Sequence, residues 1–403
     1  MPTQADRDAV RANLAFTCTH EADHLPPLDS RADELFKYGR YLEKQDGPKD
    51  FNDIARYYRI AAAWGHYKAN HNLQLLVSTG FAASPDPANE TIDLAEQLIQ
   101  AGVPGGYYDM GHYLELGYGV QPDEDKAQRY FRQAADLGSP EAQAYVGELL
   151  APWDNAPGIA RQMRQCATDQ GYGEAASTLG IDLKTAKLYP EAVKAFQKGV
   201  EAGNSQSASF LEGGFNGPPP AELLYYMALP TDLERVRRYK LIGKFIDAND
   251  GRNPKVPDID RIVPLPPAKL PPWDGTFQWQ KDQDAAVPPP QPSDDLIARL
   301  SNAKHLDPAT GLPLSASPGA QAERLPLGTV ARTGECCPED GVWSLPHIAR
   351  VRSDATQRLS KGDIMPPLVT EIPRLLPVLN RWLGMRQKAT AVAWHLVAYV
   401  DQA

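Results

Sequence analysis

Small and apolar residues recur with one fixed spacing along the first two-thirds of the chain. In residues 127–142 an alanine is followed by an aromatic pair three and four positions on, an alanine pair one turn later, and then a glycine and an alanine. The same series recurs around residues 57–69, and in weaker form in residues 160–175 and 192–203. Four units are visible: Ala127, Tyr130, Phe131, Ala134, Ala135, Gly138 and Ala142; Tyr57, Tyr58, Ala61, Ala62, Gly65 and Ala69; Ala160, Met163, Arg164, Ala167, Thr168, Gly171 and Ala175; and Ala192, Ala195, Phe196, Gly199, Val200 and Gly203.

This spacing predicts helical hairpins. Positions three and four apart share one face of a helix, so the aromatics supply bulk and the alanines leave a gap into which a neighbouring helix fits. Gly138 and its equivalents stand where each helix must end, a position that favours left-handed backbone angles. Stacked hairpins bury a continuous core that one hairpin cannot. The sequence therefore predicts a mainly α protein with a right-handed α-solenoid over residues 31–250, preceded by an N-terminal extension of residues 1–30.

Proline marks the end of the predicted solenoid. Eleven of the 37 prolines lie between Pro254 and Pro292, and this density disfavours both helix and central strand. Residues 251–292 are therefore predicted to form an extended strap. We expect Trp273, Phe277 and Trp279 to pin the strap onto the solenoid or the next domain. A polyproline ligand for a signalling domain is the alternative.

A different pattern begins at residue 293. Residues 292–300 start with a helix signal, residues 329–345 and 389–400 are typical of strands, and residues 371–385 are typical of an interrupted helix. Together these segments predict a small C-terminal α+β module over residues 293–403.

One unit carries a specific motif. Its residues resemble the Sel1-like repeat, a relative of the tetratricopeptide repeat, at Met110-Gly111, Gly117-Tyr118-Gly119-Val120, Asp123, Lys126-Ala127, Tyr130-Phe131, Ala134-Ala135 and Gly138. The departure is Leu114, where that family usually carries an aromatic. A solenoid of this kind offers a surface for holding another molecule, so the resemblance implies a binding protein.

Segments outside the repeats extend the resemblance. Residues 24–45, 264–282 and 292–313 are similar to the Sel1-repeat proteins encoded beside type VI secretion lipase genes in Gram-negative bacteria, especially those paired with phospholipase D effectors. The final module resembles modules of bacterial toxin-immunity proteins at Gly334, Cys337-Pro338, Gly341, Trp343 and Gly362-Asp363-Ile364-Met365-Pro366. The resemblance implies an immunity protein that binds the toxic enzyme of a sibling cell and blocks its active site.

Charge and hydropathy limit the partners. A formal net charge of −10 argues against nucleic acid, whose binders concentrate Lys and Arg, and favours a basic or neutral partner. No apolar run approaches the roughly 20 residues that span a bilayer, so no transmembrane segment is expected. The first twenty residues show no apolar signal core, which alone indicates the cytoplasm. The resemblance instead implies a mature periplasmic chain to which Met1 was added as a start.

Enzyme motifs are weak. His20-Glu21-Ala22-Asp23-His24 matches the HExxH of zinc proteases, but Pro26 and Pro27 stop any helix there, and no third ligand is evident. The glycines of Gly117-Tyr118-Gly119 follow no strand and serve a turn between helices. Neither a Gly-x-Ser-x-Gly elbow nor the HxK(x)₄D motif of phospholipases D occurs. We therefore expect no enzyme, no catalytic residue, no cofactor and no metal; a structural metal on Cys18, His20 and His24 is the alternative.

Four cysteines leave the disulfide pairing open. Adjacent Cys336 and Cys337 do not easily bond to each other, because a vicinal disulfide strains the intervening peptide. A bridge from Cys18 to Cys166, or from one of the adjacent pair to either of these, is compatible with the sequence.

Aromatic and acidic residues near the predicted turns are the candidate partner contacts, because interfaces are rich in Tyr and Trp. Tyr108 and Tyr113 are expected in the core, whereas Tyr118 is expected to be exposed in its loop. Asp123 and Glu124 are predicted to mimic an anionic substrate and to occupy the basic pocket of a phosphodiesterase. The candidates are Trp64, Tyr67, Tyr107, Tyr118, Asp123, Glu124, Tyr225 and Tyr226.

Two functions are compatible with these features. The first is an immunity protein that neutralises a cognate type VI secretion phospholipase effector by protein–protein contact. The alternative is a Sel1-repeat scaffold or regulatory protein that has no toxin partner.

Overall fold

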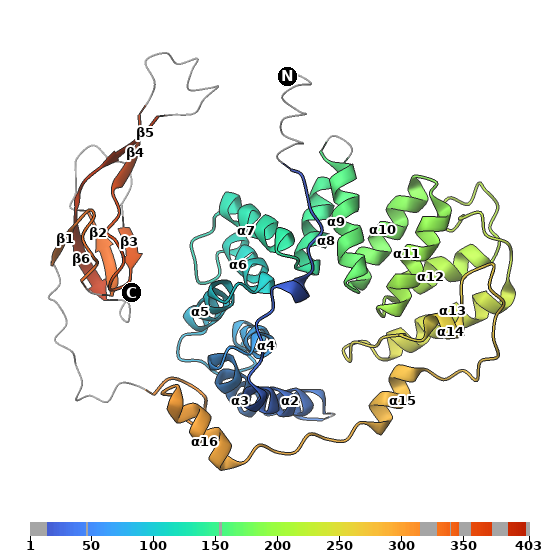
Figure 1. Cartoon of the computed structure of the whole chain (residues 1–403), viewed down its shortest axis with the longest axis horizontal. Helices are drawn as coiled ribbons and strands as arrows, with labels where there is room; N and C mark the ends of the chain where they lie inside the picture. Colours follow the sequence, from blue (N-terminus) through green and yellow to red (C-terminus); the bar gives the residue numbers. More distant parts are fainter. Residues whose placement is uncertain are drawn as a thin grey trace. The chain divides into compact units, whose positions relative to one another are not determined.

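The chain forms two compact units. The computed structural model describes residues 14–45, 47–152, 155–314, 329–338, 340–345, 356–372 and 386–399. The first unit comprises residues 1–314 and the second residues 315–403, and Figure 1 shows both. We call them the solenoid unit and the C-terminal unit.

Helices build the solenoid unit (Figure 1). Within the described residues a 3-10 turn, η1 (Glu21–Asp23), precedes fifteen α-helices, and none of these is long and apolar enough to cross a bilayer. Successive helices from α2 to α13 pack against one another, which confirms the predicted mainly α solenoid. The helices are α2 (Ser30–Lys44), α3 (Phe51–Ala63), α4 (Tyr67–Ser78), α5 (Pro87–Gln100), α6 (Pro104–Leu116), α7 (Glu124–Asp136), α8 (Pro140–Leu150), α9 (Pro157–Asp169), α10 (Gly173–Thr185), α11 (Tyr189–Glu201), α12 (Ser205–Phe215), α13 (Leu233–Ala248), α14 (Ile259–Ile262), α15 (Gln278–Ala285) and α16 (Asp294–Ala303).

Five hairpins of the repeat lie between α3 and α12. They pair α3 with α4, α5 with α6, α7 with α8, α9 with α10 and α11 with α12. The sequence pattern revealed four of them. The hairpin of α5 and α6 was missed because Leu98 and Ile99 stand where other copies carry alanines, while Leu94 and Ala95 replace the aromatic pair.

Each hairpin turns at a glycine with left-handed backbone angles. The φ values are +79° at Gly65, +72° at Gly102, +103° at Gly138, +81° at Gly171 and +81° at Gly203. An L side chain is strained at such angles. The predicted role of Gly138 and its equivalents at the helix ends is therefore confirmed.

In α7 and α11 an aromatic ring of the first helix rests on a glycine of the helix that precedes it. A Cβ atom added at Gly111 would lie 2.6 Å from the ring of Phe131, and one at Gly180 would lie 2.6 Å from the ring of Phe196. Both rings are buried. The missing side chain thus lets the two helices approach closely.

Aromatic residues pin the strap to α13, as the sequence predicted. The rings of Phe277 and Phe245 stack with their centroids 3.9 Å apart. Trp273 meets Phe277, and Trp279 meets Phe245, with ring planes close to perpendicular. The strap is therefore a packed part of the solenoid unit.

The strap is helical in two places, so the prediction of a fully extended segment is wrong there. α14 and α15 form between prolines, and α15 occupies the gap between Pro272 and Pro288. Proline prevents a helix only where it stands inside one. The average density of prolines therefore overstated their effect.

Residues 294–314 pack against the first helices of the solenoid unit, although the sequence assigned them to the C-terminal module. The apolar face of α16, with Leu296, Ile297 and Leu300, joins the core cluster that contains Ile54 and Tyr57 of α3. The boundary between the units accordingly falls after residue 314. The amphipathic pattern of α16 indicated that it buries one face, but not which surface would receive it.

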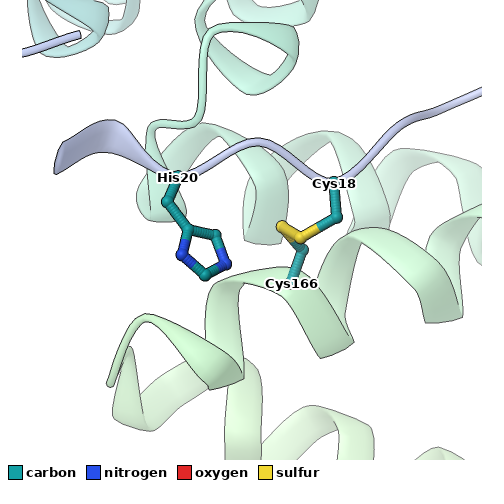
Figure 2. Close-up of side chains that lie close together, drawn as sticks. All are labelled: Cys18, His20 and Cys166. Atoms are coloured by element: carbon teal, nitrogen blue, oxygen red, sulfur yellow. A yellow bond between two sulfur atoms is a disulfide. The ribbon is translucent and has the colours of Figure 1, made fainter. Parts of the chain in front are cut away.

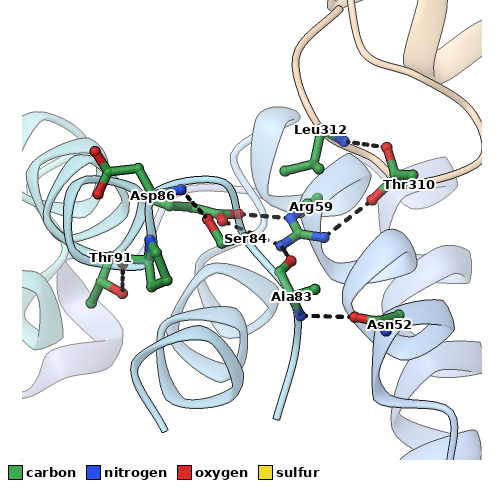
Figure 3. A network of polar contacts seen from close by, with 10 residues as sticks. Asn52, Arg59, Ala83, Ser84, Asp86, Thr91, Thr310 and Leu312 are labelled. Carbon is green, nitrogen blue, oxygen red and sulfur yellow. Dashed lines mark hydrogen bonds and ion pairs between the residues drawn. The ribbon is translucent and has the colours of Figure 1, made fainter. Parts of the chain in front are cut away.

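Arg59 on α3 links three segments of the chain (Figure 3). Its Nε lies 2.7 Å from Oε1 of Glu90, and its two Nη atoms donate to the carbonyl oxygens of Thr310 and Ala83 at 3.2 and 2.8 Å. The Arg59 side chain is only 6% exposed. The returning segment is therefore held by a buried charge as well as by apolar packing.

The described part of the C-terminal unit consists of antiparallel strands. One sheet has the order β1-β6-β2-β3 and β4 pairs with β5, with Trp343 and Trp394 buried. Strands predicted in residues 329–345 and 389–400 are confirmed, whereas the predicted helix of residues 371–385 lies outside the described residues from residue 373 onward. The strands are β1 (Val330–Arg332), β2 (Gly341–Ser344), β3 (Thr356–Leu359), β4 (Leu368–Ile372), β5 (Arg386–Thr390) and β6 (Ala393–Tyr399).

Replacing Arg59 by alanine is expected to lower the free energy of unfolding by about 3 kcal/mol, because Glu90 then keeps a largely buried charge without its cation. The amides of α16 should also exchange their hydrogens faster. Urea unfolding measures the first effect and hydrogen exchange the second.

Arg299→Ala is the matched control for Arg59→Ala. The ion pair of Arg299 with Asp295 is exposed, with side chains 69% and 81% accessible, and exposed pairs contribute roughly 0–1 kcal/mol. If the two variants lost equal stability, the buried linkage would not be holding the returning segment.

Candidate partner-binding groove

The N-terminal segment, residues 14–25, lies across α7, α8 and α9. Polar side chains of the solenoid hold its main chain at several points along its length. The pairs are Arg132 Nη2 to the Ala15 oxygen at 2.8 Å, Gln143 Nε2 to the Thr19 oxygen at 2.9 Å, and the Glu21 amide nitrogen to Gln170 Oε1 at 2.8 Å. The segment is therefore bound much as a separate peptide would be.

A disulfide between Cys18 and Cys166 fixes this segment to α9 (Figure 2). The two Cα atoms lie 5.6 Å apart, a usual separation for a disulfide. This pairing is one of those that the sequence left open. Cys18, His20 and Cys166 also form the one set of three close metal-ligand side chains in the described residues. While the two sulfurs are bonded to each other, neither is the thiolate that a metal binds.

The HExxH motif of residues 20–24 does not form a zinc-protease helix. Its central residues make the three-residue turn η1, whereas the protease motif places two histidines one turn apart on one helical face. Glu21 instead lines a cavity inside the solenoid unit.

This cavity of about 910 Å³ lies between the N-terminal segment and helices α2, α4 and α6. Charged residues of both signs line it. The cations are Lys37, Arg40, Lys44 and Lys68, and the carboxylates are Glu21, Asp109 and Glu141, with His71 beside Asp109.

Burial and neighbouring charges set the protonation of Glu21 and His71. Burial raises the pKa of Glu21 to about 7, and the nearby carboxylate of Glu141 adds to the rise. Burial alone would lower the pKa of His71. The carboxylate of Asp109, whose Oδ2 lies 3.0 Å from His71 Nδ1, outweighs the effect of burial, so the pKa of His71 is raised. Glu21 therefore gains or loses its proton close to neutral pH.

Two further cavities, of about 140 and 570 Å³, adjoin the first because they share lining residues with it. Glu141 lines all three, and Tyr108 lines both the first cavity and the smallest. Tyr172 and Glu174 line the two added cavities. We call the three cavities together the inner groove.

The two added cavities of the inner groove are acidic and rich in tyrosine. Burial raises the pKa of Tyr108 to about 12, and burial with a hydrogen bond to Glu174 raises the pKa of Tyr172, so both phenols stay protonated. Such a surface suits a basic protein segment. Its carboxylates are Glu141, Glu148, Glu174, Asp247 and Asp250, and its cations are Arg164 and Lys255.

Groove residues occupy repeated positions on the second helices α4, α6, α8 and α10. The third residue after the turn glycine is Lys68, Glu141 or Glu174 in three of the hairpins. The seventh residue after the turn glycine is Asp109 on α6 and Tyr145 on α8. Positions four apart share a helical face, so these residues form a stripe that faces the groove. Extending the repeat register past the turn glycine would have revealed them.

Tyr67 is the predicted partner contact that lines the inner groove. Trp64 instead contacts α16, because its Nε1 donates to the Leu300 oxygen at 3.1 Å. Tyr107 is half-buried beside Tyr130. The structure thus separates these three neighbouring aromatics into different environments.

Tyr118 is half-buried, contrary to its predicted exposure, because its ring lies 5.7 Å from that of Tyr113. Tyr108 and Tyr113, predicted in the core, are also partly buried and pack against a core cluster. Tyr225 and Tyr226 are half-buried as well. Their roles in binding stay predictions.

Asp123 and Glu124 lie apart from the inner groove. Asp123 caps α7, since its Oδ1 accepts a hydrogen bond from the Lys126 amide at 2.9 Å. Glu124 is exposed in the first turn of the same helix. Neither residue lines the three groove cavities, so this loop is a second, separate candidate surface.

Known proteins resemble the chain in parts. Residues 207–314 match a family model described as a domain of unknown function, DUF6396. Over 119 residues the chain is 30% identical to NMB1327 of Neisseria meningitidis serogroup B, a protein described as uncharacterized. This match covers 29% of the chain and 26% of that protein, so the chain spans about a quarter of the curated relative.

Three solved structures from Pseudomonas aeruginosa match the chain over nearly their whole length. PA5086 and the immunity protein Pa5087 are each 31% identical to it with a TM-score of 0.51, and the chain covers 95% of each. The matches span 62% and 63% of this chain. The immunity protein PA5088 is 28% identical with a TM-score of 0.52, over 62% of this chain and 94% of that one.

The raised pKa of Glu21 predicts that the folded protein loses stability as the pH rises from about 4.5 to about 7. In this range the Glu21 carboxyl keeps its proton in the folded chain and releases it in the unfolded chain. Raising the pH therefore favours unfolding. His71, whose pKa is also raised, acts in the same direction above its ordinary value. Glu21→Gln should remove about 2 kcal/mol of this pH dependence, measured by urea unfolding at pH 4.5 and 7.5.

Glu124→Gln serves as the control, because it changes an exposed carboxyl group outside the cavity. Its pH dependence should match that of the native chain. A Glu21→Gln variant with the native pH dependence would show that Glu21 ionises as freely as an exposed carboxyl group.

Proposed function

We propose that this chain, which belongs to the family that includes the P. aeruginosa proteins PA5086 and Pa5087, is itself an immunity protein that binds and neutralises a toxic effector. The inner groove carries this proposal. It joins three cavities along the second helices of successive hairpins and presents tyrosine and carboxylate side chains to a protein partner.

The partner we propose is a phospholipase effector of the phospholipase D type, delivered by type VI secretion. The resemblance of residues 24–45, 264–282 and 292–313 to proteins encoded beside such lipase genes supports this partner. The disulfide between Cys18 and Cys166 supports a periplasmic location, because disulfides persist in oxidising compartments.

Charge complementarity favours a basic segment of the effector as the part that enters the acidic portion of the groove. Groove carboxylates such as Glu141 and Glu174 lie on either side of Tyr172 in the sequence, and both line the two smaller cavities. Opposed charges steer association and fix the orientation of the partner. Inhibition is then stoichiometric, because the chain covers the enzyme and performs no reaction itself.

A scaffold without a toxin partner is the second candidate function. Solenoids of this class present binding surfaces of many kinds, and the inner groove would serve such a role equally. The two candidates differ in what happens to a cell that makes the effector.

Growth rescue tests the proposed function. Cells that direct the proposed phospholipase effector to their periplasm should stop growing, and co-expression of the native chain in the same compartment should restore growth. A purified pair should form a complex with a nanomolar Kd, as isothermal titration calorimetry would show. A chain that neither rescues growth nor binds the lipase would be a scaffold with other partners.

Charge reversals locate the binding surface. Glu141→Lys with Glu174→Lys should weaken lipase binding at least tenfold, because two carboxylates of the groove become cations facing a basic segment. Glu124→Lys is the matched change on the loop of α7, and it leaves the Asp123 cap in place. Loss of affinity in Glu124→Lys alone would instead assign the interface to that loop.

A further inference from the structure

The N-terminal segment supplies part of the wall of the inner groove. Glu21 and Leu25 line the cavity of about 910 Å³ together with residues of α2, α4 and α6. The segment itself has no regular structure beyond the turn η1, so its own backbone does little to maintain its path. The shape of the groove therefore depends on what holds residues 14–25 in place.

The surface of the solenoid leaves room for this segment at one turn. A Cβ atom added at Gly138 would lie 2.5 Å from the carbonyl carbon of His20, so only a glycine at this turn leaves room for the passing chain. Gln143 on α8 and Gln170 at the end of α9 each form a hydrogen bond with the segment's main chain, and Gln170 also donates to the Gly138 oxygen. These polar contacts compete with water when the segment lifts away.

The covalent anchor stands in the middle of the segment. Cys166 is buried on α9, whereas Cys18 is exposed, so a small dithiol can reach the bond from the Cys18 side. Glu21, three residues after Cys18, lines the cavity. Breaking the bond would leave residues 14–25 held by the polar contacts and by the partly buried Phe16.

We propose that the Cys18–Cys166 disulfide assembles the partner-binding groove, by fixing the N-terminal segment as its wall, so that the effector is bound tightly only by the oxidised chain. This inference rests on the proposed function. It adds that the groove is composite and that its completion depends on a redox step.

The redox step balances as a thiol–disulfide exchange. A dithiol reductant attacks the exposed Cys18 sulfur, the Cys18–Cys166 bond breaks, and the two cysteines gain the two hydrogens of the reductant as it closes into its own disulfide. Reoxidation by an excess of an oxidised dithiol reverses each change. Residues 14–25 then lie against α7, α8 and α9 again, and the groove is complete.

The first measurement requires no partner. Amide hydrogen exchange of residues 14–25 is followed in the full-length native chain, with and without dithiothreitol, and in Cys166→Ser. A chelator is present so that no metal ion bridges the thiols and His20. Exchange should be at least tenfold faster after reduction and in Cys166→Ser, while α11 and α12 keep their native protection. Equal protection of the segment in all three samples would overturn the inference.

Cys336→Ser is the matched control, because Cys336 carries an exposed thiol outside the solenoid unit. In this variant, amide exchange of residues 14–25 should equal that of the native chain, both before reduction and after dithiothreitol has reduced the Cys18–Cys166 bond. A change in the unreduced Cys336→Ser chain would mean that thiol substitution in general disturbs the segment.

The second measurement uses a catalytically inactivated form of the proposed phospholipase effector as the probe. The oxidised native chain and Cys336→Ser should bind it equally, whereas Cys166→Ser and the reduced native chain should bind at least tenfold more weakly, and reoxidation should restore the native Kd. Equal binding by Cys166→Ser would refute the inference and leave the proposed function standing. Failure of the oxidised native chain to bind would refute the proposed function and the inference together.

Discussion

Contact between an aromatic ring and a glycine on the preceding helix is the constraint on which the solenoid depends. Where Phe131 rests on Gly111 and Phe196 on Gly180, a single Cβ atom would enter the ring. The contact fixes both the separation and the rotation of the two helices. Because the second helix of each hairpin is tied to the first by a short glycine turn, its rotation is fixed as well, and one stripe each of α4, α6, α8 and α10 faces the inner groove.

The copy of this contact between α8 and α9 shows how scaffold and groove are connected. Opposite Gly147 the aromatic is replaced by Arg164, whose Cγ would lie 3.3 Å from an added Cβ atom. The aliphatic part of Arg164 fills the space that a ring fills elsewhere, and the residue also lines the smallest groove cavity. Burial lowers the pKa of its guanidinium. One side chain thus packs the scaffold and contributes a charge to the groove.

The sequence predicted the scaffold better than the groove for a physical reason. Packing positions are restricted to rings, alanines and glycines, so Tyr58, Ala61 and Gly65 repeat and can be recognised. The residues that face the groove share a position and no chemistry, as Lys68 and Glu141 illustrate. Their charges are free to vary because nothing in the core depends on them, which is what a surface adapted to one particular partner requires.

Long-range contacts were beyond sequence reasoning for a different reason. The bonded cysteines are separated by 148 positions, and the hydrogen bond from Arg59 to Thr310 joins residues 251 positions apart. Local patterns indicated that the strap carries pinning aromatics and that a helix begins near residue 293. They did not indicate that residues 294–314 return to α3, because the destination of an apolar face is set by three-dimensional packing.

This return has a consequence for how such a protein can change over time. An open solenoid tolerates the gain or loss of whole repeats, since each unit contacts only its neighbours. Here an inserted hairpin would shift α13 relative to α3, and the segment that spans them would no longer bring Thr310 to Arg59. Repeat number is thereby locked, and new partner specificity has to arise by exchanging side chains on a frame of constant size.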